Sequence, residues 1–102
     1  MKRGEVWWYE PPDAGRRPFL VMTRDVVVPL LHSVLAVPAT TTIRGIPTEV
    51  ELDEADGMPT RCALSVDNLR PIERSFCTDR ITTLSAERLR EVCAALRIAV
   101  DC

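Results

Sequence analysis

The side chains best suited to chemistry in this sequence are arginines in its first half. From Arg16 to Arg44 the chain also holds Arg17 and Arg24 but only one acid, Asp25. A guanidinium presents a planar fork of N–H donors that matches the oxygens of a phosphate group. A local basic surface can bind phosphate even though the whole chain has a net charge of −2. The cluster therefore favours a phosphate-bearing ligand, while a codon bias toward arginine would explain its excess over lysine equally well.

Metal and disulfide chemistry are not expected. The four cysteines, Cys62, Cys77, Cys93 and Cys102, form no C-x-x-C pair, and His32 is the only histidine. Zinc sites need ligands in close pairs. We therefore expect reduced thiols, with Cys62 and Cys93 as small core residues, and no metal or other cofactor. Imidazole groups commonly act as general bases near neutral pH, so His32 is a formal candidate, but a lone loop histidine is usually a surface residue.

Length and composition indicate one ordered domain spanning residues 1–102. Apolar residues make up 46% and charged residues 27%, which are ordinary globular values. The basic start of the chain is not followed by a long apolar run, so neither a signal peptide nor a membrane span is expected. These features predict a cytoplasmic protein. A chain of this size has a poor ratio of volume to surface, which makes dimerisation a plausible source of further burial.

Most of the chain reads as short strands separated by turns. Strands are predicted over residues 4–9, 18–23, 34–39, 48–52, 62–66 and 80–83, from β-branched, aromatic or alternating apolar residues. The run 18–23 is apolar throughout, which indicates burial on both faces. Pro38 favours an edge or a strand end. Trp7 and Trp8 alternate across the first strand, and we expect Trp7 in the core and Trp8 in a groove or dimer contact.

The chain ends in an amphipathic helix. Ser85 is the expected N-cap, and Leu84 and Leu89 flank it as a hydrophobic staple. Apolar residues then recur at helical spacing up to Val100, while Arg88, Glu91 and Arg97 are expected to face outward. Strands followed by one helix predict a mainly β fold with α, a small β-barrel with a helix packed on it.

Several segments, in this order, resemble the MazF/PemK (Kid) toxin family along nearly the whole chain. They are Arg3-Gly4-Glu5-Val6-Trp7, Arg17-Pro18-Phe19-Leu20-Val21, Val37-Pro38-Ala39-Thr40, Pro47-Thr48-Glu49-Val50 and Asp67-Asn68-Leu69-Arg70-Pro71-Ile72. The resemblance implies an SH3-like barrel, a homodimer and metal-independent cleavage of single-stranded RNA. It also implies a 2′,3′-cyclic phosphate and a 5′-hydroxyl as products, inhibition of translation and growth, and neutralisation by the C-terminal peptide of a cognate antitoxin.

The resemblance also assigns catalytic roles to Arg17 and Thr40. Pro18 restricts Arg17 to extended backbone conformations at the start of a strand, where a guanidinium could hold the scissile phosphate. Thr40 matches the family's catalytic threonine, although Thr41 and Thr42 follow at once and a shift by one residue is possible. Asp13 and Asp67 are the acidic candidates for the general base.

Other polar residues are candidates for binding RNA. Arg16, Arg24 and Arg44 are expected to contact the backbone. Asn68 and Arg70 match a polar stretch that lines the family's groove, where they would contact bases, but a simple turn explains the same stretch equally well.

Two other functions fit a fold of this kind. CcdB-like toxins bind DNA gyrase without cutting anything, but they depend on C-terminal residues around a terminal Trp, whereas this chain ends Val100-Asp101-Cys102. A plain SH3-like adaptor is the third possibility. The loop between Tyr9 and Arg17 is short for the MazF/PemK family, in which it covers the RNA groove, so the sequence leaves the cleavage motif open.

Overall fold

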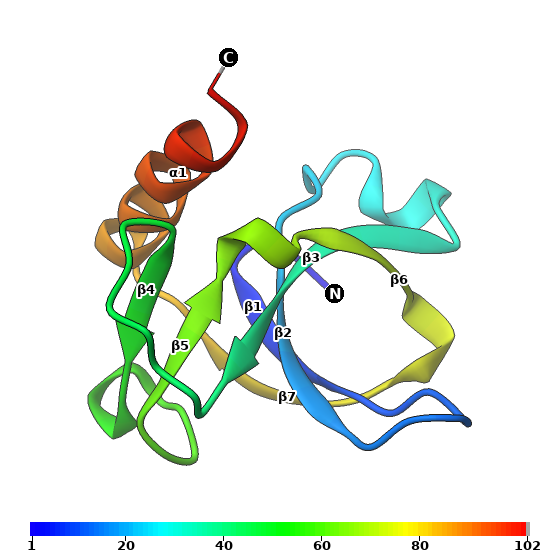
Figure 1. Ribbon diagram of the computed structural model, residues 1–102. Coiled ribbons are helices and arrows are strands. Elements are labelled where there is room, and N and C mark those ends of the chain that lie inside the picture. Colours follow the sequence, from blue (N-terminus) through cyan, green and yellow to red (C-terminus); the bar gives the residue numbers. More distant parts are fainter. Residues whose placement is uncertain (102) are drawn as a thin grey trace.

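Seven strands and one C-terminal helix make up the regular structure of residues 1–101 in the computed structural model (Figure 1). The strands are β1 Glu5–Tyr9, β2 Arg17–Val21, β3 Ser33–Thr40, β4 Glu49–Leu52, β5 Cys62–Ser65, β6 Arg70–Glu73 and β7 Cys77–Thr83, and the helix is α1 Ala86–Val100. Short 3-10 turns η1 to η4 lie at Val28–Leu30, Glu54–Asp56, Val66–Asn68 and Arg74–Phe76. Cys102, for which we expected a reduced thiol, lies outside the described residues.

The strands form one curved antiparallel sheet in the order β4-β5-β3-β2-β1-β7, and β6 pairs with the first half of β3. The mainly β class with a C-terminal helix is confirmed. A closed barrel is not confirmed, because among residues 1–101 no pairing joins β4 or β6 to β7. Within the same residues, no helix has the length and apolar character that crossing a membrane requires.

The core lies on both sides of β2 and β3. Leu20 packs in the larger cluster, with the helix and strands β4 and β5, whereas Phe19 and Val21 pack in a second cluster with Ile72 of β6. Because successive side chains of a strand point to opposite faces, β2 serves both clusters at once. This confirms the predicted burial of the segment on both faces. Trp7 is only half-buried, at the margin of the second cluster, so the expectation of a core position is met in part.

The helix begins as predicted. The Ser85 hydroxyl accepts a hydrogen bond from the Arg88 backbone N–H at 3.1 Å, and Leu84 and Leu89 pack in the same cluster. The expectation that Arg88 faces solvent is wrong. Its guanidinium binds the carboxylate of Asp56 at 2.9 Å and that of Glu91 at 2.9 Å. The ion pair with Asp56 ties the helix to the turn between β4 and β5.

Three strand predictions need correction. β6 was not predicted, because it contains Pro71 and buries only Ile72. β7 begins three residues earlier than expected, at Cys77, because its exposed residues Thr78 to Arg80 carry no apolar alternation. Pro38 lies inside a central strand rather than at an edge. It falls between the residues of β3 that pair with β6 and those that pair with β5.

Candidate active site

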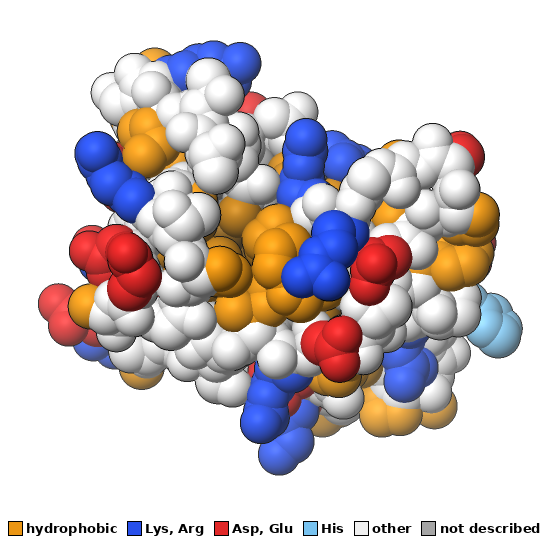
Figure 2. Space-filling model, turned by 90° about the horizontal axis from the view of Figure 1, so that it is seen from below, with side chains coloured by type: hydrophobic (Ala, Val, Ile, Leu, Met, Phe, Trp, Pro, Cys, Tyr) orange, Lys and Arg blue, Asp and Glu red, His pale blue; other side chains and the backbone are white. Residues whose placement is uncertain are grey.

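A pocket of about 380 Å³ opens where the end of β3, the start of β2 and the β4–β5 turn meet. These segments lie at the lower edge of the molecule in Figure 1. Figure 2 shows that side from below, where hydrophobic side chains gather near the middle with Lys and Arg side chains beside them. The lining residues are Trp8, Arg16, Arg17, Pro18, Ala39, Thr40, Thr41, Thr42, Met58, Pro59, Thr60 and Cys62. The structure therefore brings Arg17 and Thr40 into one site.

Strand pairing explains why these two residues meet. β2 and β3 are antiparallel, with Phe19 opposite Pro38 and Val21 opposite Ala36. Arg17 lies two residues before this paired segment on β2, and Thr40 lies two residues after it on β3. Both residues are therefore at the same end of the β2–β3 ladder, where the pocket opens.

The pocket carries positive charge without a counter-charge. Arg16 and Arg17 are its only charged lining residues within the described part of the chain, and no histidine lines it. Arg17 is exposed and forms no ion pair with any residue from 1 to 101. The guanidinium of Arg16 lies over the ring of Trp8, 3.8 Å from its centroid. An anion entering the pocket would therefore meet an arginine that has no competing carboxylate.

The hydroxyl of Thr40 is oriented by its own turn. Its Oγ1 accepts a hydrogen bond from the Thr42 backbone N–H at 3.1 Å. Because that bond uses a lone pair, the hydroxyl proton remains free to be donated to an incoming oxygen. Thr40 is half-buried, whereas Thr41 and Thr42 are exposed. This geometry favours Thr40 over its two neighbours as the threonine that acts in the pocket.

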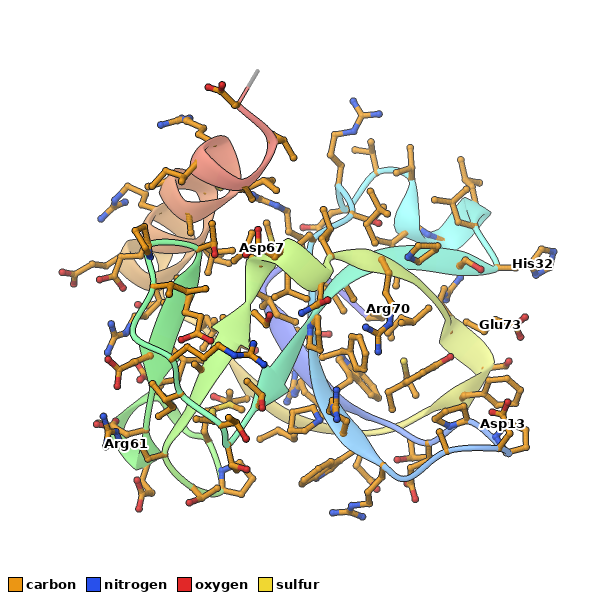
Figure 3. All side chains as sticks on the ribbon, viewed as in Figure 1. Asp13, His32, Arg61, Asp67, Arg70 and Glu73 are labelled. Atoms are coloured by element: carbon orange, nitrogen blue, oxygen red, sulfur yellow. The ribbon has the colours of Figure 1, made fainter. Side chains whose placement is uncertain are left out.

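A second hollow, of about 320 Å³, lies on the other side of the Arg16–Arg17 step. Both arginines line it together with Arg70, whose guanidinium lies 5.0 Å from the centroid of the Phe19 ring. Figure 3 shows Arg70 on β6, inside the ring of strands formed by β6, β7 and β2. Arg16 and Arg17 thus line both hollows, and Arg70 lines the second one.

Three other predicted RNA-binding residues lie outside these two hollows. Arg24 lines a separate hollow with Leu31 and Leu35. The backbone N–H of Arg44 donates to Glu49 at 2.9 Å, and the side chain of Arg44 lines neither hollow. Asn68 is exposed in the η3 turn, where its amide donates to the Ser65 hydroxyl at 2.7 Å.

The candidate bases also lie apart from the pocket. Figure 3 shows Asp13 at the tip of the β1–β2 hairpin, Asp67 near the end of β5, and His32 at the outer edge of the molecule. Asp67 accepts a hydrogen bond from the Thr48 hydroxyl at 2.5 Å, which fixes it at that turn. None of the three lines the pocket or the second hollow. The structure therefore does not bring a carboxylate or an imidazole of residues 1–101 to Arg17 and Thr40.

Sequence reasoning missed the wall of the pocket that the β4–β5 turn provides. Met58, Pro59 and Thr60 line it together with the arginines, yet the sequence of this segment predicts only an acidic turn. The thiol of Cys62 completes the floor. Burial raises the pKa of this thiol, and the nearby carboxylates of Asp56 and Asp53 raise it further, so Cys62 stays protonated at neutral pH. Cys62 is a core residue, as expected, and it is no nucleophile.

A second missed residue, Glu5, supports the strand that carries Trp8. Its side chain is 9% exposed and accepts hydrogen bonds from the Trp7 indole at 3.0 Å, the Lys2 backbone at 2.8 Å and Arg80 at 3.3 Å. Burial acts to raise the pKa of Glu5, but these donors and the N-terminal charge outweigh it, and the pKa lies below its usual value. Glu5 therefore remains a carboxylate within the fold.

Comparison with known proteins gives consistent results. The sequence model of PemK-like, MazF-like toxins of type II toxin–antitoxin systems matches residues 2–100. A probable endoribonuclease MazF5 of Mycobacterium tuberculosis is 43% identical over 98% of this chain and 93% of its own.

Solved structures agree with the sequence match. The M. tuberculosis toxin MazF-mt6 superposes with a TM-score of 0.87 at 32% identity, over 95% of this chain and 96% of that one. A MazE–MazF crystal structure from Deinococcus radiodurans has a TM-score of 0.83 at 27% identity, over 99% and 96% of the two chains. The chain belongs to the PemK/MazF-like family of type II toxins, whose relatives named here include a probable endoribonuclease.

Proposed function

We propose that this toxin cleaves single-stranded RNA at the pocket between Arg17 and Thr40, and that it inhibits translation and growth in the cytoplasm. The observation that carries the proposal is an exposed arginine, without a carboxylate partner in residues 1–101, beside a threonine hydroxyl whose proton is free. The alternative of a non-enzymatic, gyrase-binding toxin is not favoured, because the family match covers residues 2–100 and the relative at 43% identity is named an endoribonuclease.

Each group has a distinct role in this proposal. The 2′-oxygen of the ribose attacks the adjacent phosphorus while the bond from phosphorus to the 5′-oxygen breaks. Arg17 neutralises the charge that gathers on the phosphoryl oxygens, and Thr40 donates a hydrogen bond to one of them. A solvent water takes the proton of the 2′-hydroxyl, and the departing 5′-oxygen takes a proton from solvent. The products are a 2′,3′-cyclic phosphate and a 5′-hydroxyl, and no step uses a metal or another cofactor.

Substrate binding extends from this centre along the arginines. Arg16 and Arg70 border the same region as Arg17 and are placed to bind neighbouring phosphates. Arg24, Arg44 and Asn68 would contact only the more distant parts of an RNA chain. Asp13 and Asp67 line neither hollow, so the proposal assigns the general base to neither of them.

The same region is suited to an inhibitory antitoxin peptide. Arg16, Arg17 and Arg70 line the two hollows and no acidic residue of 1–101 lines either, which suits an acidic and apolar segment. The D. radiodurans structure is a complex of MazE with MazF. We propose that the C-terminal segment of a cognate antitoxin occupies this region and excludes RNA.

A homodimer is proposed through the exposed apolar surface at the β2–β3 connection. Val26 is 77% and Leu30 78% exposed, and Leu31 and Leu35 are 41% and 47% exposed. A contiguous apolar patch on a small soluble domain marks an interaction surface. Replacing Leu30 with Asp is expected to shift the mass measured by light scattering from dimer to monomer. An unchanged dimer would place the interface elsewhere.

The experiment for the proposed activity is direct. Purified protein is incubated with a defined pool of single-stranded RNA in the presence of a chelator, and the new ends are sequenced and tested for a cyclic phosphate. Cleavage at a restricted set of sequences with 5′-hydroxyl ends is expected. Intact RNA together with inhibition of gyrase would instead support the CcdB-like alternative.

A further inference from the structure

The β4–β5 turn is a fixed wall of the pocket. Met58 is 3% exposed and packs in the main core, so the chain that follows it cannot move freely. Pro59 and Thr60 come next; both are exposed and line the pocket together with Trp8, Arg16 and Arg17. Within residues 1–101 the hydroxyl of Thr60 has no hydrogen-bond partner. Met58 is buried, whereas the Pro59 ring and the Thr60 hydroxyl are exposed, so a ligand in the pocket can contact both of them.

Hydrogen bonds within the turn fix its shape. The side chain of Asp53 accepts from the Ala55 backbone at 2.9 Å, while the Asp53 backbone donates to the Asp56 carboxylate at 3.1 Å. This reciprocal capping box satisfies the first backbone donors of the turn. The chain then reverses at Gly57, which has a φ of +90°. Met58 follows Gly57 directly, so the hydrogen bonds of the turn and the φ of Gly57 fix the backbone path that leads into the pocket wall.

Two later elements hold the turn from outside. Arg88 of α1 donates to both oxygens of Asp56, at 2.9 and 3.3 Å, and the side chains are 33% and 13% exposed. Thr82 of β7 donates to the carbonyl of Asp56 at 3.0 Å. A paired, forked contact fixes both distance and orientation. Through Asp56, β7 and α1 thus fix the position of the β4–β5 turn that lines the pocket.

From these contacts we propose that the wall formed by Met58, Pro59 and Thr60 selects the base of the nucleotide that enters the Arg17–Thr40 pocket, and that Arg88 positions this wall through Asp56. The inference rests on the proposed ribonuclease function. Bases of single-stranded RNA are read by stacking and by hydrogen bonds to their edges. The Thr60 hydroxyl can donate a hydrogen bond to the edge of a base or accept one from it, and the Pro59 ring limits the size of the base that fits.

The chemistry of this wall explains why it would discriminate between bases. A site that offers a hydrogen bond rejects a ligand without the matching group, because the polar atom is then left unpaired. Such discrimination requires that the Thr60 hydroxyl keep a fixed position. Arg17 and Thr40 contact the phosphate, which is the same in every nucleotide, so these two residues cannot discriminate between bases.

The test compares four variants with the wild type. T60V removes the hydroxyl at nearly constant size, and P59A trims the ring; both residues are exposed, so the fold is expected to survive. R88Q removes the ion pair with Asp56, and R90Q is its matched control, because Arg90 is exposed on the same helix and lines no pocket described here. Each protein is given a randomised RNA pool, and rates are then measured on the preferred RNA and on single-base changes of it.

For T60V and P59A we expect the ratio of kcat/KM between the preferred RNA and its best competitor to fall about tenfold. For R88Q we expect the same broadening, with a rise in KM larger than the fall in kcat, and partial recovery in R88K. R90Q should cut the wild-type set of sequences. A general loss of stability would lower the amount of active protein without changing the cut sequences.

The outcomes separate the two proposals. If the wild type leaves all RNA intact, the proposed function fails. If the wild type cuts a restricted set of sequences and T60V, P59A and R88Q cut that same set with unchanged ratios, the wall does not select the base and this inference is overturned.

Discussion

Arg17 at the start of β2 and Thr40 at the end of β3 line the same pocket because their strands are antiparallel neighbours. The β2–β3 ladder ends at Phe19 and Pro38, and Arg17 and Thr40 lie two residues beyond that end on their two strands. The proposed catalytic groups are therefore held by the sheet itself, at the point where β3 gives way to the polar segment after it. A site on the ends of paired strands is placed more firmly than one on loops alone.

The first prediction concerns the hydroxyl of Thr40. Thr40→Val removes the donor at nearly constant size, and we expect kcat for RNA cleavage to fall roughly 100-fold, as is typical for the loss of one donor to a charged transition state. Thr40→Ser keeps the hydroxyl and should retain most of the rate. Equal rates for the Val and Ser variants in a single-turnover assay would remove Thr40 from the mechanism.

A second prediction separates the arginines by position. Arg16→Gln should weaken RNA binding and reduce the slope of log K against log salt by about one, because a phosphate contact is lost. Arg24→Gln and Arg44→Gln should have smaller effects, since neither residue lines the two hollows around Arg17. Binding is measured over a range of salt concentrations with an RNA that has a 2′-deoxy sugar at the cleavage position, so that it is not cut. A larger effect at Arg24 than at Arg16 would mean that the RNA path runs elsewhere.

The turn at Gly57 gives a prediction for stability. An added Cβ would lie 2.3 Å from the Thr82 hydroxyl oxygen, and the φ of +90° is unfavourable for other residues. Gly57→Ala should lower the free energy of unfolding by about 1–3 kcal/mol. Gly15 has open space around it and no positive φ, so Gly15→Ala is a matched control expected within about 0.5 kcal/mol of the wild type. Equal midpoints in urea for both variants would contradict this account.

The lowered pKa of Glu5 predicts a dependence of stability on pH. A carboxyl group with a pKa lower in the folded than in the unfolded state stabilises the fold above the unfolded value, which is about 4.5, and loses that contribution as the pH falls. Glu5→Gln should cost about 1–3 kcal/mol at pH 7. The difference in Tm between variant and wild type should shrink steadily toward pH 3. A difference that is constant with pH would show that the charge of Glu5 is not what stabilises the strand.

Much of this fold could be predicted from local patterns. Buried strands such as β2 carry continuous apolar residues, and Ser85 with its flanking leucines marks the start of the helix. Strand β6 could not be predicted in the same way, because its pairing with β3 compensates for Pro71 and a single buried residue. A barrel was expected from short strands separated by turns and followed by one helix, and from the family resemblance, but the pairings among residues 1–101 do not show closure.

The site was predictable only in part. Arg17 and Thr40 were found through short motifs, and the strand register then brings them together. The wall at Met58 to Thr60 could not be found, because its shape depends on contacts with Arg88 and Thr82, which lie far along the chain. Asp13 and Asp67 were chosen for their chemistry alone. Neither of them lines the pocket or the second hollow.

The measurement that tests the central claim most directly is the single-turnover rate on one preferred RNA, with the wild type, Arg17→Ala and Arg97→Ala compared at matched folded concentrations. Arg97 is exposed on α1 and lines no pocket described here, so its variant should match the wild-type rate. Arg17→Ala should lose at least about 100-fold while its unfolding midpoint is preserved. Cleavage at the wild-type rate by Arg17→Ala would contradict the account.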